Sequence, residues 1–129
     1  MKLNPECVRD VLFSIEELST HDSLLTSDQL SKTKFLTKYS NDEILYHLNQ
    51  LYLAEYIIAP KNHKLIDETF LVNDLSPIGH EFISNIRNDT NWNKVKKISK
   101  KVGTETLSSL KSIAEGVIAS AIKASLGMS

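Results

Sequence analysis

One stretch constrains the fold more than any other: residues 39–58, YSNDEILYHLNQLYLAEYII, join a short amphipathic helix to a β-prone segment almost without a spacer. Ser40 can accept hydrogen bonds from the free N–H groups of a first helical turn, and Glu43 can reach back, which is the S-x-x-E capping box. A helix is therefore expected to begin here. Its apolar face comprises residues three and four positions apart: Ile44, Leu45, Leu48, Leu51 and Tyr52.

The chain has 129 residues, of which 41% are apolar, enough for one modest core and few for two full domains. We expect one domain over residues 1–90 and an extension over residues 91–129. No apolar run of about 18 residues predicts a membrane span, and the N-terminus MKLNPE lacks the pattern of a secretion signal. The sequence predicts a cytoplasmic protein without membrane contact.

The net charge of −1 hides an uneven distribution. Residues 1–90 hold 8 Lys and Arg against 14 Asp and Glu, whereas residues 91–129 hold 7 against 2. Phosphate neutralisation by Lys and Arg supplies most non-specific affinity for DNA. The acidic first part is therefore a poor generic nucleic-acid binder.

Two helices are expected before the opening stretch. Asn4 and Pro5 suit a helix start, which predicts a first helix from Pro5 to Leu18. A second helix is expected from Ser27 to Phe35. Lys32, Lys34 and Lys38 give this region the local basic cluster of the first half.

A β-hairpin is expected after the helix of the opening stretch, with strands over residues 56–60 and 65–72. Pro60 is tolerable there only at an edge or strand end. The tip would carry Lys61, Asn62, His63 and Lys64. The fold class is thus mainly α with a small β-hairpin (α+β), a winged helix-turn-helix with a C-terminal helical extension.

Three further helices are expected. Ser76 and Pro77 begin one whose core face is Ile78, Phe82, Ile83 and Ile86, and a basic helix from Trp92 to Lys101 is stopped by Gly103. A last helix from Thr104 to Leu126 must bury its apolar stripe, either against its own domain or in a homodimer. The stripe that would form such an interface is Leu107, Leu110, Ile113, Ala114, Val117, Ile118, Ala121 and Ile122.

Four segments carry a resemblance to a known family: MKLNPECVRDVLFSIEE, YSNDEILYHLNQLYLAEYI, DLSPIGHEFISNIRND and WNKVKKISKKVGTETLSSLKSIA. The chain resembles a family of small, uncharacterised bacterial and phage proteins, a domain of unknown function common in prophages. The resemblance implies a winged helix with helical C-terminal extensions, acting in a bacterial host cell. Where the usual pattern has Gly before the wing, this chain has Glu55, so this position must accept a side chain or a backbone shape that Gly adopts more easily.

Catalytic and metal-binding signatures are absent from the sequence. The four histidines and Cys7 show no H-x-x-x-H or C-x-x-C spacing, and no glycine-rich phosphate loop is present. We therefore expect no enzyme activity, no metal and no cofactor.

Two functions remain open, together with a third in which the basic tail makes the interaction. The first is a DNA-binding regulator that acts as a homodimer, and the second is a module that engages a host protein, for example to neutralise a defence system. Asp42 and Glu43, at the helix start, favour the protein partner because they would sit near phosphates. The candidate contact residues for double-stranded DNA or a protein are Lys32, Lys34, Lys38, Asn41, Tyr46, His47, Asn49, Gln50, Lys61, Asn62, His63 and Lys64.

Overall fold

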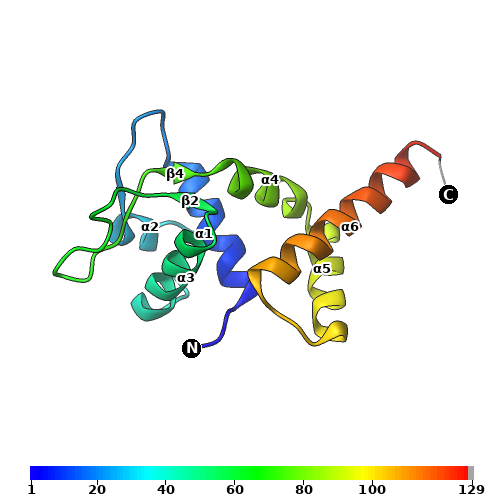
Figure 1. The fold of residues 1–129 in the computed structure, drawn as a ribbon, viewed down its shortest axis with the longest axis horizontal. Helices are drawn as coiled ribbons and strands as arrows, with labels where there is room; N and C mark the ends of the chain where they lie inside the picture. Colours follow the sequence, from blue (N-terminus) through cyan, green and yellow to red (C-terminus); the bar gives the residue numbers. More distant parts are fainter. Residues whose placement is uncertain (128–129) are drawn as a thin grey trace. The chain divides into compact units, whose positions relative to one another are not determined.

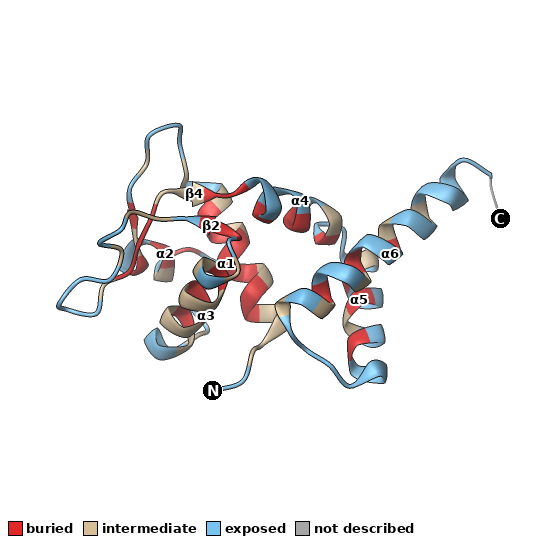
Figure 2. Cartoon of the chain, in the orientation of Figure 1, coloured by how far each residue is buried: buried red, intermediate tan, exposed pale blue. Residues whose placement is uncertain are grey.

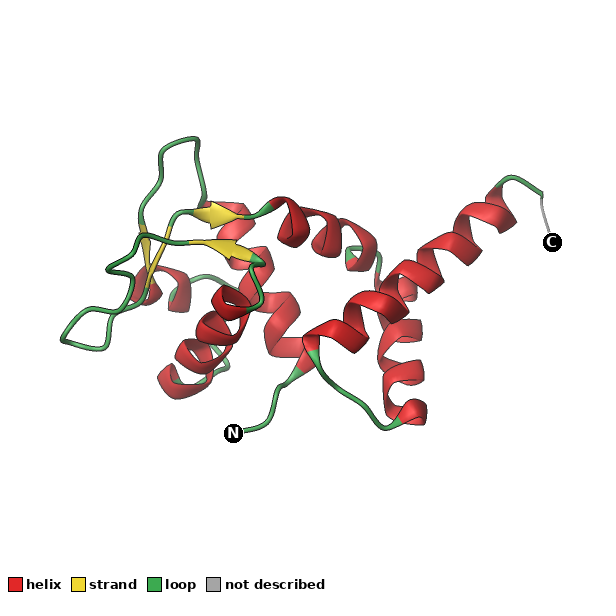
Figure 3. Cartoon of the chain, in the orientation of Figure 1, coloured by secondary structure: helices red, strands yellow, loops and turns green. Residues whose placement is uncertain are grey.

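The computed structural model describes residues 1–127 and is mainly helical, with two small antiparallel sheets (Figures 1 and 3). This confirms the expected mainly α chain with little β structure. Its contacts divide the chain into two compact units, Met1–His80 and Glu81–Ser129. The expected division into residues 1–90 and 91–129 remains a prediction.

Helix α1 (Pro5–Leu18) is the centre of the first unit and contacts α2 (Ser27–Ser31), α3 (Asn41–Leu53) and β4 (Asp74–Leu75). It begins and ends where the sequence predicted. The side chain of Asn4 caps it by accepting a hydrogen bond from the backbone N–H of Glu6 at 3.0 Å. Most of its surface is buried (Figure 2).

Helix α2 is shorter than the predicted Ser27–Phe35, and its cap is Thr26 instead of Ser27. Ser27 is used elsewhere: its backbone N–H and its hydroxyl oxygen bond the backbone of Phe70 at 2.8 and 3.0 Å. The Thr33 hydroxyl donates to the Leu30 carbonyl at 2.8 Å, and turns follow in place of further helix. The expected boundary at Phe35 was therefore wrong.

Helix α3 has the predicted capping box, because Ser40 and Glu43 exchange hydrogen bonds of 3.1 Å each. It ends at Leu53 with Ala54 as its C-cap, and the next residue, Glu55, has a φ of 66° in the left-handed region. The N–H of Tyr56 donates to the Leu51 carbonyl at 2.9 Å, as a Schellman motif requires. Glu55 thus adopts the backbone shape that glycine adopts more easily.

The strands pair differently from the predicted hairpin. Strand β2 (Ile57–Ile58) pairs with β4, while β3 (Leu71–Val72) pairs with β1 (Leu25–Thr26). Residues 65–72 are not one strand because residues 65–69 form a turn, in which Glu68 has a φ of 66° and the Asp67 carboxylate accepts from the Thr69 N–H at 3.1 Å. The outermost loop is therefore residues 65–69, here called the tip loop, and not Lys61–Lys64.

Asn73, between β3 and β4, joins the two sheets. Its N–H donates to the Ile58 carbonyl at 2.8 Å, on the β2 side. On the β1 side, its carbonyl accepts from the Ser23 hydroxyl at 2.7 Å and its amide donates to the Ser23 carbonyl at 3.1 Å. Asn73 thus contacts β2 on one side and the segment just before β1 on the other.

Helix α4 (Pro77–Ile86) begins with Ser76 as predicted, since its hydroxyl accepts from the Gly79 N–H at 3.1 Å. Phe82, Ile83 and Ile86 are buried, whereas Ile78 is 37% exposed and does not belong to the core. Gly79 cannot be replaced freely, because a Cβ there would overlap the carbonyl oxygen of Tyr56.

The second unit contains α5 (Asp89–Val102) and α6 (Leu107–Ser125), which pack on each other. Gly103, with a φ of 82°, ends α5 as predicted. Within residues 1–127, none of the helices combines the length and apolar character needed to cross a membrane.

Candidate functional site

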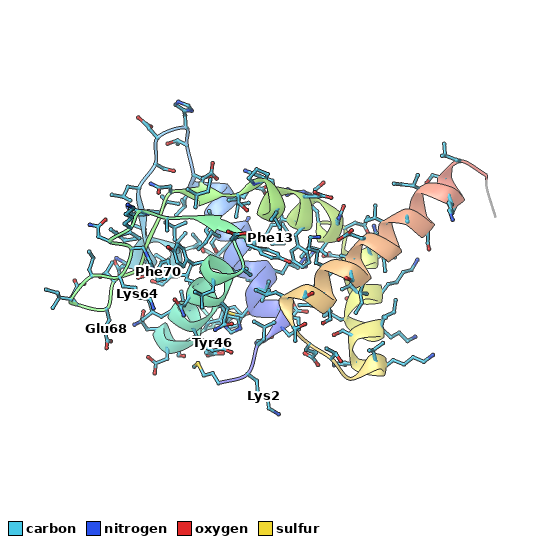
Figure 4. All side chains as sticks on the ribbon, in the orientation of Figure 1. Lys2, Phe13, Tyr46, Lys64, Glu68 and Phe70 are labelled. Atoms are coloured by element: carbon cyan, nitrogen blue, oxygen red, sulfur yellow. The ribbon has the colours of Figure 1, made fainter. Side chains whose placement is uncertain are left out.

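A groove of about 390 Å³ runs between α3 and the tip loop, here called the α3–tip groove. Asp42 and Glu68 line it together with one cation, Lys64. Its other lining residues are apolar or neutral: Leu45, Tyr46, Asn49, Leu65, Thr69 and Phe70. Figure 4 shows Tyr46, Lys64, Glu68 and Phe70 on the same side of the unit.

A second hollow, of about 550 Å³, is lined by residues of α2, α3 and the tip loop, here called the α2 hollow. Its charged lining residues are Asp28, Asp67 and Glu68, and no cation lines it. Hydrogen bonds from Thr69 lower the pKa of Asp67 from its ordinary value, which favours the charged form. Glu68 lines both depressions, so the tip loop adds negative charge to each.

Helix α3 leaves Tyr46, Asn49 and Gln50 partly exposed to solvent, and Asn41 lines the α2 hollow. His47 was wrongly placed on that face, because it is only 2% exposed. Its Nε2 accepts a hydrogen bond from the N–H of Asn4, and its Nδ1 bonds the Glu43 carbonyl at 2.7 Å. Burial lowers the pKa of His47, so it is a neutral structural histidine.

The predicted basic cluster is exposed but already engaged. Lys32 pairs with Asp28 at 3.0 Å, and Lys38 pairs with Asp10 at 3.2 Å. Asp10 also accepts a hydrogen bond of 2.7 Å from the Tyr39 hydroxyl. The ammonium group of Lys34 lies 5.2 Å from the centre of the Phe35 ring. These contacts leave less cationic surface for a phosphate than the sequence suggested.

The four residues of the predicted wing tip lie in three different environments. Lys61 and Asn62 are exposed, and Lys64 lines the α3–tip groove. His63 instead packs between aromatic rings, 4.0 Å from the centre of Tyr52 and 5.1 Å from that of Phe70. It supports the wall of the groove and does not project from a tip.

The predicted interface on α6 is partly used within the chain. Leu110, Ala114 and Val117 are buried where α6 packs on α5, which leaves less apolar surface for a second subunit. The other predicted members retain exposure: Leu107, Ile113, Ile118, Ala121 and Ile122.

Sequence reasoning anticipated Asp42 but missed the contribution of the tip loop to the acidic site. Asp67 and Glu68 were placed inside a strand, although Asp67 is of a residue type that favours turns. Asp28 and Phe70 reach the site only through tertiary folding. Among residues 1–127, no three His, Cys, Asp or Glu side chains are grouped so as to hold a metal ion.

Comparisons with known proteins place the chain among uncharacterised proteins. Residues 2–105 match the family described as Hypothetical protein (DUF2513). An uncharacterized protein of Haemophilus influenzae is 29% identical over 119 residues, which cover 92% of this chain and 96% of the relative. No solved structure matches the chain.

Proposed function

The chain belongs to the Hypothetical protein (DUF2513) family, and we propose that it is a non-enzymatic protein-binding module with a winged-helix fold. The order of elements along the chain supports that fold: α1, β1, α2, α3, β2, and then the two consecutive strands β3 and β4. Residues 71–75 pair with β1 on one side and β2 on the other, as the third strand of a winged helix does.

The charge of the α3–tip groove is the main support for a protein partner. Asp42 and Glu68, against the single cation Lys64, line it together with apolar residues that include Leu45 and Phe70. A partner segment with an apolar side chain beside Lys or Arg would bury the apolar side chain against these residues and pair the cation with the carboxylates. For a chain of phage or prophage origin, that partner would be a cytoplasmic protein of the bacterial host.

A DNA-reading function of α3 is the alternative, and the winged-helix order favours it. The charges oppose it, since Asp42 and Glu68 line the same surface and would repel phosphates. Among the lysines expected to contact phosphates, Lys32 and Lys38 already contact carboxylates.

Affinity capture from bacterial lysate with the full chain tests the proposal. The variant Asp42→Lys with Glu68→Lys should lose any partner that the wild type retains. Glu17→Lys with Asp22→Lys is the matched control, because it changes the charge equally at exposed positions outside the groove. A partner retained equally by wild type and both variants would contradict the proposal.

Duplex DNA provides the second arm of this test. Binding that is lost in Asn49→Ala with Gln50→Ala and strengthened by Asp42→Lys with Glu68→Lys would support the DNA-reading alternative. If α3 binds a protein and not DNA, the Asn49 and Gln50 variant should not lose DNA binding while the Asp42 and Glu68 variant gains it.

We also propose that any homodimer forms through the exposed part of α6. Ile122 is 54% exposed, and Ile118 and Ala121 are partly exposed. Light scattering should then report a dimer for the wild type and a monomer for Ile118→Glu with Ile122→Glu. A wild-type monomer at high protein concentration would overturn this proposal.

A further inference from the structure

Helix α5 presents an extended cationic face. Five of its residues are lysines: Lys94, Lys96, Lys97, Lys100 and Lys101. Its apolar side is only partly covered: Trp92 and Val95 are buried, whereas Ile98 and Val102 are exposed. Lys94, Lys97, Lys100 and Lys101 are exposed and form what we call the α5 lysine face.

The α5 lysine face has no counter-charge of its own. Within the part of the chain that the structure describes, none of its four lysines makes an ion pair, whereas Lys32, Lys38 and Lys111 each contact a carboxylate. Asp89 is the acidic residue of the helix and lies in its first turn. The positive charge along the rest of α5 is therefore open to a partner.

The spacing of the lysines is unfavourable for the helix alone. Lys97 lies three residues from Lys94 and from Lys100, and four from Lys101. Like charges at these spacings sit side by side on a helix and destabilise it. An anionic partner would remove that repulsion, so binding and helix stability would increase together.

We propose that the α5 lysine face binds the phosphate backbone of double-stranded DNA without reading its sequence. The face extends over about 10 Å of helix, a length over which a DNA duplex carries about six charges. The four lysines of the face and the roughly six duplex charges over this length are thus of the same order, and each lysine can face a phosphate. This inference concerns a surface outside the α3–tip groove and goes beyond the proposed function.

Two other polyanions fit the face less well. Single strands are held by stacking on aromatic side chains, and Trp92, the aromatic residue of α5, is 1% exposed. A membrane surface needs a broad apolar helix face to insert, and the exposed apolar residues of α5 are only Ile98 and Val102. A duplex requires neither an aromatic platform nor an apolar face.

Fluorescence anisotropy of a labelled random-sequence duplex, titrated with the full chain between about 50 and 200 mM NaCl, tests the inference. The wild type should bind with an affinity that falls steeply with salt, because each phosphate contact contributes about −0.9 to the slope. Lys97→Gln with Lys101→Gln should lower affinity at low salt about tenfold or more and flatten the slope by about 2.

Lys111→Gln with Lys123→Gln, on α6, is the matched control for charge and should leave both quantities near the wild-type values. Far-UV circular dichroism should show all variants folded, since the substituted positions are exposed. The inference is overturned by any of three results: no duplex retention at low salt, equal losses in both variants, or binding to phosphatidylserine vesicles without binding to the duplex.

Discussion

The backbone N–H of Asn4 donates a hydrogen bond of 2.9 Å to Nε2 of His47, across a separation of 43 residues. Nε2 must therefore carry a lone pair, so the proton of the neutral ring is on Nδ1, which donates to the Glu43 carbonyl. The contact fixes the start of α1 against α3. Protonation of Nε2 would remove the acceptor.

The first prediction concerns acid sensitivity. Burial lowers the pKa of His47 in the folded state, so below the ordinary value of 6.5 the unfolded chain binds the proton first. Above about pH 6.5, His47 should make the free energy of unfolding neither rise nor fall with pH. It should fall by up to about 1.4 kcal/mol per pH unit as the pH drops toward the folded pKa.

Urea unfolding of wild type and His47→Gln over this pH range isolates the effect. The amide of glutamine can accept from Asn4 but does not titrate. The difference between the two stabilities should therefore shrink toward low pH, and a difference independent of pH would rule out the assignment.

The second prediction concerns Glu55. Its left-handed conformation is strained for a residue with a Cβ. Glu55→Gly should raise the free energy of unfolding by about 1 kcal/mol, whereas Glu55→Ala keeps the Cβ and should gain little. Thermal melting of both variants checks this, and equal stabilities would show that the strain is relieved elsewhere.

The third prediction compares two glycines. Gly79→Ala should destabilise the protein by about 1–3 kcal/mol, because the new Cβ overlaps the Tyr56 carbonyl. Gly116→Ala, in the interior of α6 with nothing within 4 Å of a Cβ, should stabilise it by about 0.5–1 kcal/mol. Denaturant titration should give changes of opposite sign in the free energy of unfolding. A shared sign would contradict the close approach of Gly79 to the Tyr56 carbonyl.

The fourth prediction concerns the thiol of Cys7. It is buried, and burial, with Glu43 and Asp10 nearby, raises its pKa to about 12. A disulfide reagent at mildly alkaline pH should therefore react at least about tenfold more slowly with the folded chain than with the chain in urea. Rapid modification of the folded protein would show that α1 opens readily.

The starts of α1, α3 and α4 could be predicted from the sequence because local hydrogen bonds determine them. The predicted starts of the last two helices, Trp92 and Thr104, were wrong, since α5 begins at Asp89 and α6 at Leu107. Asn4 and Ser40 cap their helices through residues two or three positions away. Gly103 ends α5 through its own backbone conformation. Each signal lies within a few residues of the boundary that it sets.

The strand pairing and the site depend on contacts that no local pattern contains. Leu71 pairs with Thr26, and the Ser23 hydroxyl bonds the Asn73 carbonyl across 50 residues. In a helical projection, His47 lies on the polar face of α3. In the folded chain, however, the segment at Asn4 covers it. The acids of the groove likewise come from segments that only the tertiary fold brings together.

Asn73 holds the strands of both sheets in register independently of the tip loop. Because this residue contacts both Ile58 and Ser23, aligning one pair of strands also aligns the other. Residues 65–69 lie outside this alignment, in a turn closed by the Leu65 N–H to the Thr69 carbonyl at 2.9 Å. The tip loop can therefore change length or charge, and with it the shape and charge of the α3–tip groove, while the register of both sheets stays the same.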